Sequence, residues 1–160
     1  MKATTLLLSH HRRIQRLVTS VARERAAREE RTSSLIEAIV AHIATEENVL
    51  YPTAERELAI DLRQQRASHV RARLALFRFA TSAIQDDSFT IHLSSLDRAM
   101  RDHALGESHL VRRLENEMSE SVLYRLGEKM LAFENALVAL PAFSLGKRQP
   151  APYAPYANAN

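Results

Sequence analysis

The chain carries one pair of side chains twice: a histidine followed four residues later by a glutamate, at His42 and Glu46 and again at His103 and Glu107. Residues four apart on an α-helix project from the same face, one turn above the other. Imidazole nitrogens and carboxylate oxygens both bind divalent metal ions. The chain has no cysteine, which excludes thiolate zinc sites, iron–sulfur clusters and cysteine nucleophiles. The repeated pair therefore favours a metal site built from imidazole and carboxylate ligands.

Both glutamates lie on the apolar side of their predicted helices. At about 100° per residue, Glu46 shares its face with Leu35, Ile39, His42, Val49 and Leu50. Glu107 shares its face with Leu96, Met100, His103, Leu110, Val111 and Leu114. A carboxylate in such a position loses its hydration, at a cost of several kcal/mol, unless it is paired or bound to a cation. One pair alone is explained equally well by a core hydrogen bond, but two pairs favour a cation.

Length and composition set wider limits on the function. A chain of 160 residues is long enough for one domain with a sizeable core. No apolar run reaches the ~18 residues of a membrane span, and the N-terminus lacks the pattern of a signal peptide. The net charge is +3, but basic and acidic residues are interspersed, as in Arg23-Glu24-Arg25, and only 6% of residues are aromatic. We therefore expect a cytoplasmic protein that binds neither membranes nor nucleic acid.

Apolar residues recur at helical spacing through most of the chain, and strand-like alternation is absent. The pattern predicts helices over residues 4–25, 34–51, 61–84, 88–118 and 121–140. Ser34 and Glu37 form a capping box at the start of the second helix, and Pro52 ends or kinks it. Four long helices with short connections predict an all-α, up-down antiparallel four-helix bundle, with the additional C-terminal helix packed on its outside. We assign residues 1–140 to this domain and residues 141–160, rich in Pro, Ala, Tyr and Asn, to a flexible tail.

Further histidines come to the height of the repeated pairs in such a bundle. At about 1.5 Å per residue, His69 on the third helix faces His103 on the fourth. On the first helix, His10 and His11 both come near the height of His42. The mean direction of the apolar residues on that helix lies nearer to His10, so the helical geometry leaves both histidines as candidates.

The order His11, His42-x-x-x-Glu46, His69 and His103-x-x-x-Glu107, with one group on each helix, resembles the hemerythrin-like (HHE cation-binding) domain family. The run HIATEENVLYP from His42 to Pro52 is similar to the second-helix signature of that family, and HRRI from His11 to Ile14 to its first-helix signature. The resemblance covers roughly residues 5–115 and favours His11 over His10. It implies a non-haem centre of two iron ions held by His11, His42, Glu46, His69, His103 and Glu107. It also implies that both glutamates and an oxo or hydroxo group bridge the ions.

Two departures from the family pattern bear on the function. Oxygen-carrying members have another histidine one turn after the third-helix ligand, where this chain has Arg73. Arginine cannot bind iron because it stays protonated, so either one iron has an open position or only one metal binds tightly. Glu107 lies four residues after His103, where the oxygen carriers have a carboxylate five residues on. The four-histidine, two-glutamate form resembles a bacterial subgroup associated with peroxide and nitric oxide chemistry.

Three other side chains have simpler interpretations. Tyr51 lies about 180° around its helix from His42, which predicts packing; a bend at Pro52 would instead turn its phenolate toward the metal. We expect His92 at the edge of the core and His109 on the surface.

Three functions from different classes fit these residues. The first is an enzyme whose diiron centre reacts with hydrogen peroxide or nitric oxide, with Arg73 as a catalytic residue that stabilises a developing anion. The second is a module that reversibly binds oxygen, nitric oxide or iron. The third is a metal-free helical interaction protein. Arg73 favours the first, while iron and manganese both accept these ligands and the oligomeric state stays open.

Overall fold

The computed structural model describes residues 1–140 as helices joined by short connections. The longer helices are α1 (Ala3–Arg23), α2 (Arg28–Thr45), α4 (Arg63–Thr81), α5 (Asp87–Gly106) and α7 (Glu120–Val138). The shorter elements are η1 (Arg25–Ala27), η2 (Glu46–Leu50), α3 (Tyr51–Leu58) and α6 (Ser108–Glu117). This part of the chain contains no strand. The predicted tail, residues 141–160, lies outside the described residues.

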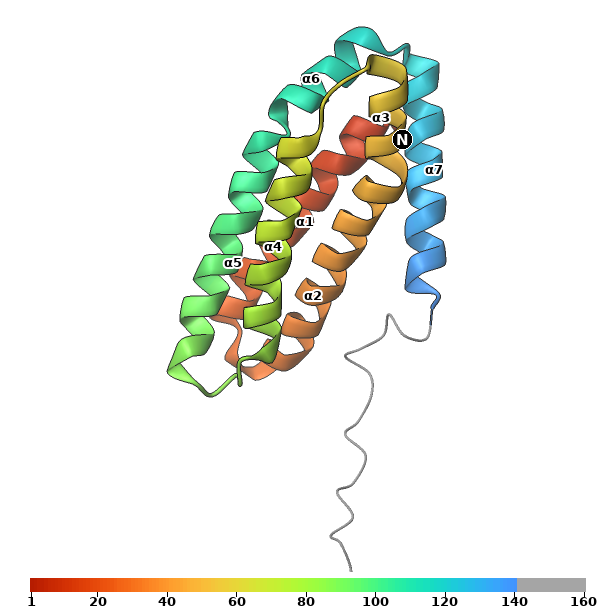
Figure 1. Ribbon diagram of the computed structural model, residues 1–160. Coiled ribbons are helices and arrows are strands. Elements are labelled where there is room, and N and C mark those ends of the chain that lie inside the picture. Colours follow the sequence, from red (N-terminus) through yellow and green to blue (C-terminus); the bar gives the residue numbers. More distant parts are fainter. Residues whose placement is uncertain (141–160) are drawn as a thin grey trace, which may run out of the picture.

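The helices α1, α2, α4 and α5 run alternately down and up and form the bundle (Figure 1). At one end of the bundle α3 continues the line of α2, and α6 continues that of α5. The last helix, α7, packs along α1 and α2 on the outside. The predicted all-α bundle with an additional C-terminal helix is therefore confirmed.

The bundle core consists of two apolar clusters separated along the helix axes by a polar layer. The cluster at the end of the α4–α5 loop includes Ile14, Val18, Leu35, Ile39, Leu76, Phe79, Phe89, Leu93 and Met100. The cluster at the other end includes Leu6, Leu7, Leu50, Leu62, Leu110, Leu114, Leu123 and Met130. On α1, α4 and α5 the candidate ligands lie in sequence between members of the two clusters, and on α2 the first cluster extends to Ile43, one residue past His42. Apolar side chains therefore cover the polar layer from both ends.

The second helix differs from its predicted start and end. It begins at Arg28, so the capping box predicted at Ser34 is wrong, and Ser34 lies inside the helix. Glu29 and Glu30 provide the negative charge that favours the helix start at Arg28, six residues before the predicted one. Pro52 does not end the helix either, because one π-helical turn, η2, leads directly into α3, which carries Pro52 in its first turn.

The predicted fourth helix is divided at Glu107, one of the candidate ligands. The α5 helix ends at Gly106, a residue of low helix propensity, and α6 begins at Ser108. Glu107 keeps a near-helical backbone, and its carbonyl still accepts a 2.9 Å hydrogen bond from the N–H of Val111. The division is therefore a local bend, and it leaves α6 in the line of α5.

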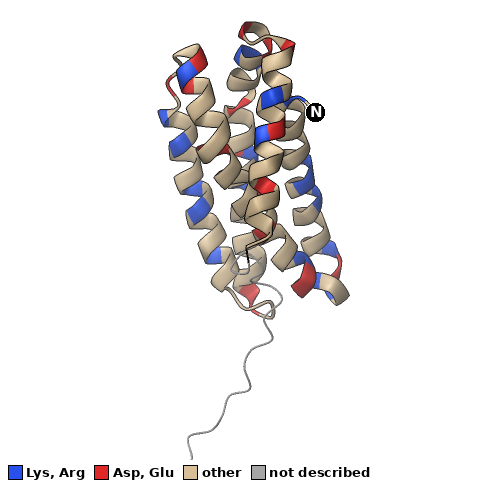
Figure 2. Cartoon of the chain, turned by 90° about the vertical axis from the view of Figure 1, so that its right-hand side faces the viewer, with Lys and Arg blue, Asp and Glu red and all other residues tan. Residues whose placement is uncertain are grey.

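Across residues 1–140, no helix has both the length and the apolar character that crossing a membrane requires. Figure 2 shows Lys and Arg interspersed with Asp and Glu along the helices. The exceptions are α1, with four arginines, and α4, with five, since neither helix carries an acidic residue.

Candidate metal centre

The polar layer brings together all six residues that the sequence named as ligands. They are His11 on α1, His42 on α2, Glu46 at the start of η2, His69 on α4, and His103 and Glu107 on and just after α5. Five of them are at most 1% exposed. The sixth, His11, has a side chain that is 12% exposed. The cluster is thus almost entirely shielded from water.

The donor atoms of these side chains form two overlapping groups of four, and within each group they lie within 4.8 Å of one another. One group consists of His11, His42, Glu46 and His103, and the other of Glu46, His69, His103 and Glu107. One Glu46 oxygen lies 3.2 Å from His42 Nε2, and the other lies 2.8 Å from His69 Nε2. Glu46 and His103 belong to both groups, so they stand between two positions that could each hold a cation.

Several donor atoms in this layer are buried without a hydrogen-bond partner, namely His11 Nε2, Glu46 Oε1 and Glu107 Oε2. His11 Nε2 and Glu107 Oε2 are 3.4 Å apart, but their geometry does not make a hydrogen bond. An unpaired buried polar atom costs about 1–3 kcal/mol, and such atoms are rare in native proteins. His42 Nε2 and His103 Nε2 also approach to 2.9 Å, a distance that requires a proton or a cation between them. The donor set therefore fits metal ions.

Burial favours the neutral form of two imidazoles of the cluster, those of His42 and His103. It lowers the pKa of His42 well below its ordinary value, helped by the neighbouring histidines, and it lowers the pKa of His103 as well. Burial and the Glu107 carboxylate raise the pKa of Glu46 well above its ordinary value. The pKa of Glu107 is lowered, since burial opposes ionisation there but His11, His103 and its other partners outweigh it. Of the two glutamates, Glu46 is therefore the one that holds a proton more readily.

Tyr51 points into the polar layer beside the candidate ligands. Its hydroxyl donates to Glu107 Oε1 and lies 3.1 Å from Glu46 Oε2 and 3.2 Å from His69 Nε2. The ring is fully buried and stacks on that of His69. Burial and the two carboxylates raise the pKa of Tyr51, so its hydroxyl keeps its proton in this environment. Of the two alternatives, outward packing is wrong and the inward orientation is observed.

The π-helical turn explains why Tyr51 points inward. The backbone N–H of Tyr51 bonds to the carbonyl of Glu46, five residues back instead of four. The wider turn holds an extra residue, which rotates Tyr51 away from its position on a regular α-helix. Pro52 favours this turn because it has no N–H for the carbonyl of Asn48 and its ring would clash with that carbonyl. In the same turn, the side-chain amide of Asn48 donates to the carbonyl of Ala44 at 2.7 Å.

Two residues that the sequence analysis missed hold candidate ligands from behind. The hydroxyl of Ser68 donates to a backbone carbonyl at 2.7 Å, so it accepts from His103 Nδ1 at 3.1 Å. Glu47 Oε1 accepts from His69 Nδ1 at 2.9 Å. A proton on Nδ1 leaves Nε2 with the lone pair that binds a metal. The sequence signal that could have identified them is their position next to a predicted ligand, since Ser68 precedes His69 and Glu47 follows Glu46.

Arg73 lies outside the cluster of six. One nitrogen of its guanidinium is 2.9 Å from Glu47 Oε1, the other bonds to Glu47 Oε2, and the side chain is half exposed. Glu47 Oε1 is the same oxygen that accepts from His69. Arg73 is therefore connected to the candidate ligands only through Glu47.

His10 and His11 point to different neighbours, although both are largely buried. His10 Nε2 lies 3.1 Å from Glu134 Oε2 on α7, and this contact lowers the pKa of Glu134. His11 instead faces Glu107 within the cluster. The structure thus brings His11 to the candidate ligands and uses His10 to join α1 to α7. His92 is half-buried and His109 is exposed.

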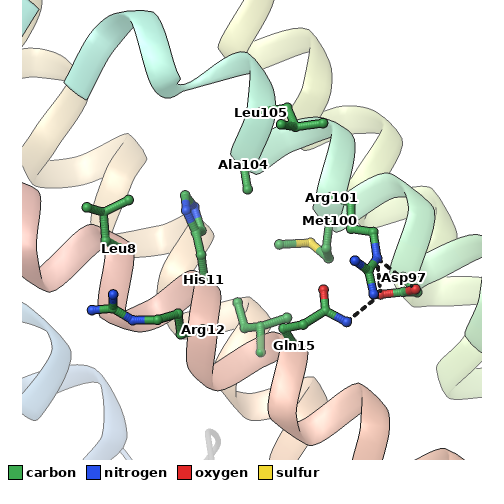
Figure 3. Close-up of a pocket in the computed structure, with 10 residues that line it drawn as sticks. Leu8, His11, Arg12, Gln15, Asp97, Met100, Arg101, Ala104 and Leu105 are labelled. Carbon is green, nitrogen blue, oxygen red and sulfur yellow. Dashed lines mark hydrogen bonds and ion pairs between the residues drawn. The ribbon is translucent and has the colours of Figure 1, made fainter. Parts of the chain in front are cut away.

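An open pocket of about 430 Å³ lies between α1 and α5, next to the cluster (Figure 3). His11 is the one candidate ligand in its wall. The pocket therefore offers a small molecule a route from solvent to the His11 side of the polar layer.

The model of one known family matches most of the chain: the hemerythrin HHE cation-binding domain, over residues 2–114. The crystal structure of an HHE cation-binding domain-containing protein from Mycobacterium kansasii is similar, with a TM-score of 0.71 and 17% sequence identity over 91% of this chain and 99% of that one. At this identity the likeness shows a shared fold. No curated protein matches the chain. Because the family match covers the bundle together with all six clustered residues, the chain belongs to the hemerythrin HHE cation-binding domain family.

Proposed function

We propose that this protein holds two iron ions in its polar layer and that the centre reacts with hydrogen peroxide. The proposed ligands are His11, His42, Glu46, His69, His103 and Glu107. The observation that carries the proposal is that Glu46 and His103 belong to both groups of donors. Each position has imidazole and carboxylate donors, a combination that suits iron. Two carboxylates also offset part of the charge of two cations in a buried site.

The hydroxyl of Tyr51 supports peroxide as the reactant. A bound pair of iron ions would supply Lewis acidity and electrons. The protein itself supplies a proton donor, because the O–H of Tyr51 is within hydrogen-bond distance of three proposed ligands. Reducing peroxide to water consumes protons, whereas reversible binding of oxygen or nitric oxide does not. A donor at this position therefore favours peroxide chemistry.

We assign Arg73 a positioning role within this function. Its ion pair holds Glu47, which accepts the Nδ1 proton of His69 and so directs the opposite nitrogen of that ring toward the cluster. The Arg73→Gln variant should keep the iron content of the wild type, and the absorption of its iron centre should shift because His69 is less firmly held.

Iron content and peroxide consumption test the proposed function directly. Protein produced in iron-supplemented medium should contain about two irons per chain and absorb in the near ultraviolet, and it should consume hydrogen peroxide when dithiothreitol supplies the electrons. His103→Gln should lose about one of the two irons and with it the reaction, because Nε2 of His103 lies within reach of both donor groups and its single lone pair binds one ion. His109→Gln, at an exposed position on α6, is the matched control and should behave as the wild type.

Two results would replace this proposal. Protein that contains neither iron nor zinc after such production, and takes up neither metal later, would favour a metal-free interaction protein. A spectrum that changes reversibly with oxygen, without consumption of peroxide, would favour a binding module.

A further inference from the structure

The pocket between α1 and α5 has a polar end, and its other walls are mainly apolar. Leu8 on α1 and Leu105 on α5 both line it and are exposed for such large apolar residues, at 41% and 72%, and the side chain of Arg12 lies beside Leu8 (Figure 3). Met100 and Ala104 continue the apolar wall past the ring of His11 (Figure 3), and Ile14 also lines the pocket. An exposed apolar wall of this kind is typical of a site that receives an apolar ligand.

The polar end of the pocket is a fixed network across the two helices. Asp97 accepts hydrogen bonds from the side-chain amide of Gln15 at 3.0 Å and from Arg101 Nε at 3.0 Å (Figure 3). The terminal nitrogens of Arg101 make no hydrogen bond within the part of the chain that the structure describes. They remain available to a polar group at that end of a ligand.

The pocket is larger than hydrogen peroxide needs. A water molecule occupies about 30 Å³ in the liquid, and hydrogen peroxide has one oxygen more. A pocket of about 430 Å³ exceeds that requirement several-fold and falls within the range of organic ligand sites. From Leu8 to Gln15 it extends about 10 Å along α1, at about 1.5 Å per residue. An extended carbon chain advances about 1.25 Å per atom, so a body of about eight carbons spans it.

Resting on the peroxide chemistry proposed above, we propose that the pocket makes an organic hydroperoxide with a compact apolar body the preferred substrate. The body packs against Leu8, Met100 and Leu105, and the hydroperoxide group lies beside His11. In the overall conversion the O–O bond breaks, and a thiol reductant supplies two electrons and two protons. One oxygen leaves as water, the other stays on the carbon as an alcohol, and the thiols become a disulfide.

Two variants of the pocket test this substrate class with the iron-loaded full-length protein. Ala104→Phe fills the pocket at a half-buried position, and Leu105→Glu places a charge at an exposed position on its edge. The measured quantity is the loss of cumene hydroperoxide or of hydrogen peroxide, with dithiothreitol as reductant. Both variants should raise the KM for cumene hydroperoxide about ten-fold, the effect of losing contact with roughly two methylene groups. The iron content should not change, and the KM for hydrogen peroxide should rise much less than that for cumene hydroperoxide, because hydrogen peroxide has no apolar body to pack against the wall.

Binding of an unreactive analogue provides a second measurement that is independent of turnover. Cumyl alcohol, the product of the reaction, should bind the iron-free wild type, and both variants should weaken this binding about ten-fold. Val70→Phe, on the outer face of α4 where Val70 is 64% exposed, is the matched control and should bind as the wild type does.

The outcomes separate this proposal from the one on which it rests. A wild type that consumes neither peroxide refutes the proposed function and the substrate class together. A wild type that consumes hydrogen peroxide, but whose reaction with cumene hydroperoxide is no more efficient and is unaffected in either variant, refutes the substrate class alone.

Discussion

The two donor groups predict how many metal ions each single variant loses. His11 occurs only in the first group and His69 only in the second, whereas Glu46 occurs in both. His11→Gln and His69→Gln should therefore each retain about one iron per chain. Glu46→Gln should retain none, although the replacement keeps the size of the side chain, because an amide cannot supply two anionic oxygens. His10→Gln, which alters the contact to Glu134 instead, should retain about two.

The number of bound ions also determines how much metal raises the thermal stability of each variant. An ion present at a hundred times its Kd stabilises the folded state by about 2.7 kcal/mol. In a domain of this size, 1 kcal/mol raises the Tm by about 3 °C. Adding Fe(II) without oxygen should therefore raise the Tm of the wild type by about 16 °C, that of the one-site variants by about 8 °C, and that of Glu46→Gln by almost nothing.

Calorimetric scans paired with metal analysis on the same samples provide the measurement. The refuting result is a variant series in which His11→Gln and His69→Gln behave like Glu46→Gln. A single shared ion would produce that pattern, and the two overlapping donor groups would then form one metal site instead of two. Retention of two ions by Glu46→Gln would refute the bridging position of Glu46 directly.

Three further predictions follow from the same contacts. Tyr51→Phe should keep about two irons and slow peroxide consumption about 100-fold. It should also lower the free energy of unfolding of the metal-free protein by about 1–3 kcal/mol in a denaturant titration, because buried carboxylates lose a hydrogen-bond donor. An unchanged rate would show that Tyr51 takes no part in the reaction. Because the pKa of Glu46 is raised, Fe(II) binding should release protons and should weaken as the pH falls. Calorimetric titration in buffers of different ionisation enthalpy detects this release, and heats that do not depend on the buffer would contradict it. Gly127→Ala should lower the Tm, because the added Cβ would collide with the Met1 carbonyl oxygen. At Gly106 an added Cβ meets no atom within 4 Å, so Gly106→Ala should raise the free energy of unfolding by up to about 1 kcal/mol. Equal Tm values for the two variants would refute the close approach at Gly127.

Local rules explain how much of the molecule was predictable from the amino-acid order. A histidine and a glutamate four residues apart share a helix face wherever the helix forms, so His42 with Glu46 and His103 with Glu107 were identified without any tertiary information. The helical spacing of apolar residues likewise predicts the bundle and its approximate helix ranges. The structure confirms the fold and gathers the six predicted residues in one buried layer.

The tertiary structure determined the side-chain directions that depend on rotations of less than one helical turn. His10 and His11 are about 100° apart on one helix, and packing against α7 sends the first to Glu134. Arg73 has a long side chain, which reaches outward to Glu47 because a buried guanidinium would lose its hydration. Tyr51 faces the ligands because one π-helical turn before Pro52 changes the rotation of every residue after it. Sequence periodicity assumes a constant angle per residue, and this turn is where that assumption fails.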